Sequence, residues 1–230
     1  MYSPALLSLI DIISNHLKSI KIEEALPLII NLGASNSTVV EDRLVEHGNI
    51  FTADRVDIED CYIHKEYVGE CFKASIEDMK IIPSLRYDIA FANYVFEHIE
   101  HIDQALREVQ RILKPGGILV LTSPNPRAPE FILSKFSPLW FHQLLRGDKK
   151  NRGERAYKTV YAYKNILEFI EKAENIGFIL EQVDYFSFTI AYLSRFPLLN
   201  IVSKWYDKRI NISSWNILKG NICIKFKKNY

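Results

Sequence analysis

Short apolar runs alternate with stretches of helical periodicity along most of this chain. The first run, Leu26 to Leu32, is almost continuously apolar, as a strand covered on both faces of a sheet requires. Further strands are predicted at residues 49–54, 71–75, 87–93, 118–124, 178–186 and 221–228. Because helical patterns separate most of these strands, the chain is expected to form βαβ units and an α/β fold with a parallel sheet.

Helices are predicted at residues 1–25, 36–47, 102–113 and 163–175. The helix after the fourth strand should end at the sequence Lys-Pro-Gly-Gly, residues 114–117, because proline cannot continue a helix and glycine accepts the left-handed conformation that closes one. Two segments depart from the alternation. Residues 125–160 are interpreted as a cap inserted over the sheet, and residues 188–207 as a second helical insertion, so residues 1–230 are expected to form one domain.

Composition narrows the class of protein. The 230 residues carry 29 Lys+Arg against 28 Asp+Glu, which argues against a polybasic nucleic-acid binder. Cys61, Cys71 and Cys223 are odd in number and lack CxxC spacing, so we expect neither a disulfide framework nor a metal site, and a cytoplasmic location fits best. The amino terminus lacks the basic region of an export signal, and no run of about 18 uncharged apolar residues predicts a membrane span.

The first candidate site is the turn of small residues that follows the first strand, from Asn31 to Ser37. Small side chains let a ligand approach the backbone, and the helix that follows offers free N–H groups, although a tight turn needs small residues for packing as well. Asp54 closes the second predicted strand 21 residues after Gly33, near the spacing of an acid that binds a ribose. Together the two features favour a nucleoside site.

The type of nucleoside follows from what the turn lacks. A dinucleotide fingerprint would have glycine at positions 33, 35 and 38, but Ser35 and Thr38 stand there, so NAD is disfavoured. A P-loop is excluded because no Gly-Lys-Ser/Thr follows the turn. A reductase or another nucleotide-binding enzyme stays open as an alternative.

Three segments resemble one family: IINLGAS, YDIAFANYVFEHIEH and REVQRILKPGGILVLTSPN. They are similar to the class I S-adenosylmethionine-dependent methyltransferases, especially the methyltransferase type 11 group that includes quinone-biosynthesis enzymes, over Leu26 to Pro124. The resemblance implies a Rossmann-like, doubly wound, seven-stranded sheet, mostly parallel with an antiparallel carboxy-terminal strand. It also implies S-adenosyl-L-methionine as the cofactor.

The resemblance assigns roles to individual residues. Gly33, Ala34 and Ser35 would lie against the methionine part of the cofactor. Asp54 would hold the ribose hydroxyls through charge-assisted hydrogen bonds, and Asn31 occupies the place of the family's acid at the end of strand one.

On the adenine side, Ser75 and Ile76 take the family's acidic position and its neighbour, while Asn93 and Tyr94 fall beside the sulfonium. The departures at Asn31, Ser35 and Ser75, together with Ser37 at the third glycine, remove charge or backbone room. A cofactor-binding but inactive homologue that acts as a partner or regulatory subunit is therefore the alternative to an active enzyme.

Methyl transfer depends mostly on positioning, because the sulfonium is already an activated electrophile. A hydroxyl acceptor would need a base, and histidine titrates in the right range. His98 and His142 are the candidates, whereas His101 is interpreted as a residue at a helix start.

The acceptor is expected to be a small-molecule, lipid-linked or glycan compound methylated on oxygen, nitrogen or carbon. The cap contains aromatic and basic residues that could form a surface for a lipid-linked or anionic acceptor and a peripheral membrane contact. The competing interpretation is an apolar face packed on the sheet. No nucleic-acid partner is expected, and the sequence does not indicate an oligomeric state.

Overall fold

A computed structural model describes residues 2–21, 25–129, 160, 162–193 and 197–229. Its centre is one seven-stranded sheet of order β3-β2-β1-β4-β5-β7-β6. The strands are β1 (Leu28–Leu32), β2 (Thr52–Asp57), β3 (Val68–Lys73), β4 (Tyr87–Asn93), β5 (Leu113–Pro124), β6 (Phe178–Phe186) and β7 (Asn221–Lys228). The first five strands are joined by parallel pairing, and β7 lies antiparallel to both β5 and β6. The predicted fold class is confirmed.

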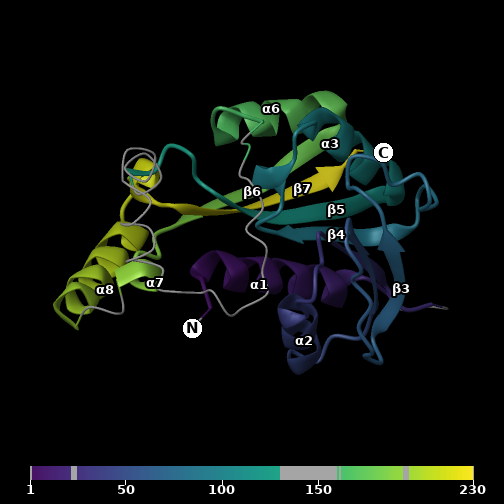
Figure 1. Ribbon diagram of the computed structural model, residues 1–230, viewed down its shortest axis with the longest axis horizontal. Helices are drawn as coiled ribbons and strands as arrows, with labels where there is room; N and C mark the ends of the chain where they lie inside the picture. Colours follow the sequence, from purple (N-terminus) through teal and green to yellow (C-terminus); the bar gives the residue numbers. More distant parts are fainter. Residues whose placement is uncertain (1, 22–24, 130–159, 161, 194–196, 230) are drawn as a thin grey trace.

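Helices cover both faces of the sheet (Figure 1). One face carries α1 (Pro4–Ser19) and α2 (Val39–Glu46), and the other carries α3 (Ile102–Ile112) and α6 (Ile166–Ile176). Side chains of β4 alternate between the two cores: Ile89 and Phe91 pack with α1 and α2, while Ala90 and Ala92 pack with α3 and α6. Covering on both faces explains why these strands read as continuous apolar runs.

Capping residues fix three ends of helices α1 and α6. The Ser3 hydroxyl accepts a hydrogen bond from the Leu6 N–H at the start of α1, and Asn165 accepts one from the Glu168 N–H at the start of α6. Gly177 closes α6 in the left-handed conformation with φ +105°, which a residue without a side chain adopts readily.

Several boundaries differ from the sequence prediction. Strands β4, β6 and β7 have the predicted limits, but β2 continues to Asp57 instead of ending at Asp54, and β3 spans residues 68–73 instead of 71–75. The polar pair Asp54 and Arg55 ended the apolar pattern, yet both side chains are buried, at 1% and 0% exposure, because distant partners satisfy them. Helix α3 ends at Ile112 and β5 begins at Leu113, so the Lys-Pro-Gly-Gly segment lies within the strand and does not close the helix as predicted.

The two predicted insertions have different outcomes. Residues 130–159, most of the predicted cap, lie outside the described residues. The second insertion forms α7 (Ile190–Leu193) and α8 (Pro197–Ile212), and so extends beyond its predicted end at residue 207. Within the part of the chain that the structure describes, no helix combines the length and the apolar character needed to cross a bilayer.

Candidate cofactor site

The turn between β1 and α2 is shaped around Gly33. Gly33 has φ +68°, and a Cβ atom there would lie 2.7 Å from the side chain of Val95. The N–H groups of Gly33 and Ala34 donate to the Val56 carbonyl at 2.9 and 3.2 Å. Any larger residue at position 33 would therefore clash with Val95 and take up an unfavourable conformation.

A buried arginine holds the rest of this turn. The Arg55 guanidinium donates through one nitrogen to the carbonyls of Ala34, Ser35 and Ser37 at 3.1, 3.1 and 2.8 Å. Its Nε donates to the Cys61 carbonyl at 3.1 Å. Three carbonyls fixed by one rigid donor group keep the turn closed although serine stands at positions 35 and 37, and Ser35 adopts φ +44°.

Glu41, in α2, supplies the counter-charge to Arg55. Its Oε1 accepts from Arg55 at 2.5 Å and from the Asn31 side-chain amide at 2.7 Å, and the side chain is fully buried. Burial raises the pKa of the Glu41 carboxyl, while Arg55 and the Asn31 hydrogen bond act in the opposite direction. The second oxygen, Oε2, is buried and has no hydrogen-bond partner among the residues that the structure describes.

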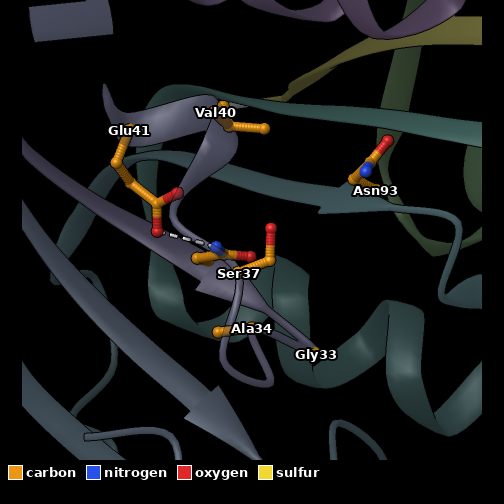
Figure 2. Close-up of a pocket in the computed structure, with 7 residues that line it drawn as sticks. Gly33, Ala34, Ser37, Val40, Glu41 and Asn93 are labelled. Carbon is orange, nitrogen blue, oxygen red and sulfur yellow. Dashed lines mark hydrogen bonds between the residues drawn. The ribbon is translucent and has the colours of Figure 1, made fainter. Parts of the chain in front are cut away.

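A small cavity of about 40 Å³ lies beside this carboxylate (Figure 2). Glu41 and Asn93 stand on opposite sides of it, and Glu41 is the charged member of the lining set, which comprises Asn31, Gly33, Ala34, Ser37, Val40, Glu41 and Asn93. The volume accommodates a few water molecules and is far too small for a nucleoside. It can take only the end of a larger ligand, and the unpaired carboxylate oxygen suits a cationic end such as an ammonium group.

Asp54 does not have the position that the sequence predicted for it. It pairs with Ile30 in the middle of the sheet, whereas β2 ends three residues later at Asp57. Its Oδ2 accepts from the Arg86 guanidinium at 2.7 Å and from the Tyr87 hydroxyl at 2.9 Å, and its Oδ1 accepts from the Glu70 N–H at 2.8 Å. Asp54 therefore joins β2, β3 and β4 inside the molecule and does not reach the carboxyl edge of the sheet.

Asp57 is the acid that stands at this edge. Its Oδ2 accepts from the Ser35 N–H at 2.9 Å and its Oδ1 from the Glu59 N–H at 2.9 Å. Each oxygen uses one of its two lone pairs in these contacts, so Asp57 retains acceptor capacity next to the turn. Asp57, not Asp54, is therefore the candidate for the ribose role that the spacing predicted.

Asn93 and Tyr94 follow β4 at the same edge. Asn93 lines the cavity and accepts a hydrogen bond from the Thr122 hydroxyl at 2.8 Å. Tyr94 has φ +57°, its N–H donates to the Thr122 carbonyl at 3.2 Å, and its hydroxyl donates to Asn221 at 2.6 Å. A left-handed tyrosine held by β5 and β7 marks a strained position of the kind found at functional sites.

Ser75 and Ile76, the expected adenine neighbours, come just after β3. The Ser75 hydroxyl accepts from the Glu77 N–H at 3.1 Å, and Ile76 is 5% exposed and packs into the core under α3. Neither residue lines the small cavity that the described residues form.

Of the two histidine candidates, the structure describes His98 but not His142. His98 lies in a short 3₁₀ helix, Phe96–His98, directly after β4, with its Nε2 4.0 Å from Oε1 of Glu97. Burial raises the pKa of Glu97 to about 7. His142 lies outside the described residues, whereas His101 precedes α3 as the sequence predicted.

The sequence interpretation missed Glu41, Arg55 and Asp57. An alternating pattern was present in β2, because Ala53, Arg55 and Asp57 share one side of the strand, but two charged residues read as the end of a strand. A glutamate on a predicted amphipathic helix reads as solvated. Only the packing of α2 on β1 and β2 shows that Glu41 and Arg55 neutralise each other.

The three cysteines bear on the expectation of neither a disulfide framework nor a metal site. Cys61 and Cys223 are buried and Cys71 is half-buried, and all three are free thiols. Burial raises the pKa of Cys61 to about 11 and that of Cys223 to about 12, so both are protonated at neutral pH. Among the described residues, no group of His, Cys, Asp and Glu could hold a metal ion.

Comparison with known proteins agrees with this geometry. Residues 48–121 match the family described as a methyltransferase domain. A ubiquinone/menaquinone biosynthesis C-methyltransferase, UbiE of Bartonella henselae, is 39% identical over 88 residues, which cover 37% of this chain and 30% of that protein. Residues 48–121 are thus similar to a methyltransferase domain, and the 88 matched residues to a quinone-biosynthesis methyltransferase. The resemblance predicted from the sequence is thus confirmed.

One further relative and one solved structure extend the comparison. The sterol 4-C-methyltransferase strm-1 of Caenorhabditis elegans is 33% identical over 57 residues, 25% of this chain and 15% of that protein. The matched segments thus span less than a third of the length of these curated relatives. A Burkholderia thailandensis 1,6-didemethyltoxoflavin-N1-methyltransferase, solved with its substrate and S-adenosylhomocysteine, shares the fold with a TM-score of 0.56 at 12% identity, covering 99% of this chain and 80% of that one.

Proposed function

We propose that this protein transfers the methyl group of S-adenosylmethionine to a small-molecule acceptor. The domain match and the relatives named as quinone, sterol and toxoflavin methyltransferases support the reaction class. The observation that carries the proposal is the buried Glu41 carboxylate beside the turn after β1, with one oxygen lacking a partner among the described residues.

Glu41 compensates for the missing carboxylate at the end of strand one. The amide of Asn31 stands where a carboxylate is expected at the end of strand one, so the site has lost a negative charge there. The Asn31 amide donates to Glu41, and Glu41, although paired with Arg55, supplies a carboxylate to the cavity from the neighbouring helix. In this proposal the carboxylate of Glu41 accepts a hydrogen bond from the ammonium of the cofactor's methionine part.

The remaining residues complete the proposed site. Gly33 and Ala34 let the methionine part approach the backbone, Asp57 accepts hydrogen bonds from the ribose hydroxyls, and Asn93 lines the far side of the cavity. Ser75 and Ile76 remain proposed neighbours of the adenine. When bound, the cofactor supplies an electrophilic methyl group that needs only an aligned acceptor.

The acceptor's chemistry determines whether a base is needed. For a hydroxyl acceptor we propose His98 as the group that takes the proton, because it follows β4 at the edge of the sheet that carries the cavity. A quinone-like carbon or an amine acceptor depends less on a base to remove its proton. The relatives' named substrates favour a small, largely apolar molecule over a glycan.

Titration calorimetry with two ligands tests the proposal. S-Adenosylhomocysteine carries the amino acid part, whereas 5′-methylthioadenosine has the adenosine and sulfur without it. We expect Glu41→Gln to weaken binding of S-adenosylhomocysteine by about 10- to 100-fold, the effect of losing a hydrogen bond to a charged group. Binding of 5′-methylthioadenosine should not change.

Asp57→Asn and Asp54→Asn provide the matched pair on strand β2. Asp57→Asn should weaken both ligands alike, because both carry the ribose, while Asp54→Asn should lower stability and leave both affinities unchanged. Unchanged binding of S-adenosylhomocysteine by Glu41→Gln would remove Glu41 from the site. A wild-type protein that binds neither ligand would overturn the proposed function.

A further inference from the structure

Helix α8 is oriented with its polar side inward. Ser203, Asp207 and Ile210 are its buried residues, at 1%, 8% and 9% exposure. Asp207 accepts hydrogen bonds from the hydroxyls of Ser187 and Thr189 at 2.7 and 2.9 Å. These contacts fix which side of α8 faces the protein.

The opposite side of α8 is apolar and exposed. We call this the outer face of α8; it consists of Leu198, Ile201, Val202, Trp205 and Ile212, which are 79%, 68%, 57%, 63% and 79% exposed. The spacing of these residues is that of one helical stripe. Two more exposed apolar residues, Trp215 and Ile217, follow directly after the helix. Between Trp205 and Ile212 the same side carries Lys208 and Arg209, so the stripe is both apolar and basic. Exposed apolar patches edged by polar residues are typical of interaction sites.

The charges beside the stripe are all positive. Lys204, Lys208 and Arg209 are exposed on α8, and the helix's one acidic residue, Asp207, is buried. A second copy placed across a two-fold axis would bring these cations against the same cations, which is unfavourable. An anionic surface complements them instead.

The position of α8 agrees with such a surface. Strand β6 runs parallel to β5, since both are antiparallel to β7, and its carboxyl end leads into α7 and α8. The cavity beside Glu41 lies at the carboxyl ends of β1 and β4. Figure 1 shows α8 projecting beyond the end of the sheet, clear of both helical layers.

We propose that the outer face of α8, flanked by its three cations, binds to the surface of an anionic lipid bilayer. Apolar and tryptophan side chains enter the boundary between headgroups and acyl chains while the lysines and the arginine contact lipid phosphates. The helix lies in the plane of the surface, and this docking holds the cavity edge of the sheet toward the lipid. The proposal is independent of the methyl-transfer chemistry.

Vesicle co-sedimentation of the full chain tests this. The wild type should bind vesicles of phosphatidylcholine containing phosphatidylglycerol, bind pure phosphatidylcholine at least tenfold more weakly, and lose affinity as salt is raised. Tryptophan fluorescence should shift to shorter wavelength with the anionic vesicles, since Trp205 and Trp215 leave water.

A matched pair of substitutions locates the contact. Ile201 on α8 and Leu167 on α6 are both 68% exposed. Ile201→Ser combined with Trp205→Ser should reduce vesicle binding about tenfold or more, while Leu167→Ser should leave it unchanged. Equal effects of the two, or no binding by the wild type, would refute the proposal. A dimer in solution that the α8 substitutions dissociate would identify a second copy as the occupant and refute it as well.

Discussion

Two buried carboxylates, Glu41 in α2 and Asp207 in α8, organise the backbone around them in different ways. Asp207 uses both oxygens within its own region: Oδ1 accepts from Ser187 and Thr189, and Oδ2 accepts from the Ile190 N–H at 3.0 Å. Glu41 uses Oε1 for two partners and leaves Oε2 without one among the described residues. The Asp207 contacts all hold residues 187–190 and so have a structural role, whereas a buried carboxylate with one oxygen left without a partner is suited to a ligand.

The largest expected effect comes from removing the cation beside Glu41. Arg55→Met leaves a buried carboxylate without its counter-charge and frees the carbonyls that hold the turn. We expect the free energy of unfolding to fall by about 3–5 kcal/mol, measured by urea denaturation. The control is Lys65→Met, which removes an exposed ion pair with Asp42 and should cost less than about 1 kcal/mol. Equal losses in both variants would contradict the role of Arg55.

Glu97 sharpens the comparison, because its Oε2 also lacks a partner among the described residues but no arginine compensates it. Its pKa is raised by burial from 4.5 to about 7, so the folded state holds its proton more tightly than the unfolded state. The contribution of protonated Glu97 to the free energy of unfolding is therefore fully present below about pH 4.5, and it is lost as pH rises through 7. The loss is on the order of 3 kcal/mol.

Urea denaturation of the wild type and of Glu97→Gln between pH 5 and pH 8 measures how much the ionisation of Glu97 lowers the free energy of unfolding. The variant cannot ionise at position 97, so its stability should fall less over that range than the wild type's. Parallel pH profiles for the two proteins would mean that Glu97 titrates near its ordinary value.

The smallest effect is expected at Asp207. Asp207→Ala removes the acceptor of four hydrogen bonds under α8 and should lower the free energy of unfolding by about 1–3 kcal/mol. Because Asp207 does not line the cavity, the affinity for S-adenosylhomocysteine should stay the same in calorimetric titration. A tenfold loss of affinity would place Asp207 in the ligand site and end the distinction between the two carboxylates.

The sequence determined the fold class and the resemblance to a methyltransferase domain. Strands β4, β6 and β7 were located correctly, since their apolar runs are bounded by polar or turn residues. Of the segments that carried the resemblance, β4 and most of β5 lie within the matched residues 48–121. These features are local, so a pattern read along the chain contains them. The sequence also placed Asn31, Gly33, Ala34 and Asn93 in one site, and all four line the cavity.

The tertiary structure alone decided which charged residues are buried and which face the ligand. Asp54 matched the expected spacing for a ribose acid, but Arg86 and Tyr87 engage it inside the sheet, and Asp57 stands at the edge instead. The orientation of α8 was likewise decided only by the tertiary structure, because the apolar side of a helix usually packs inward, whereas Ser203 and Asp207 are buried in α8. A charged side chain is stable in the interior only when it forms ion pairs or hydrogen bonds. Its partners here lie far along the chain, so these contacts exist only in the folded molecule.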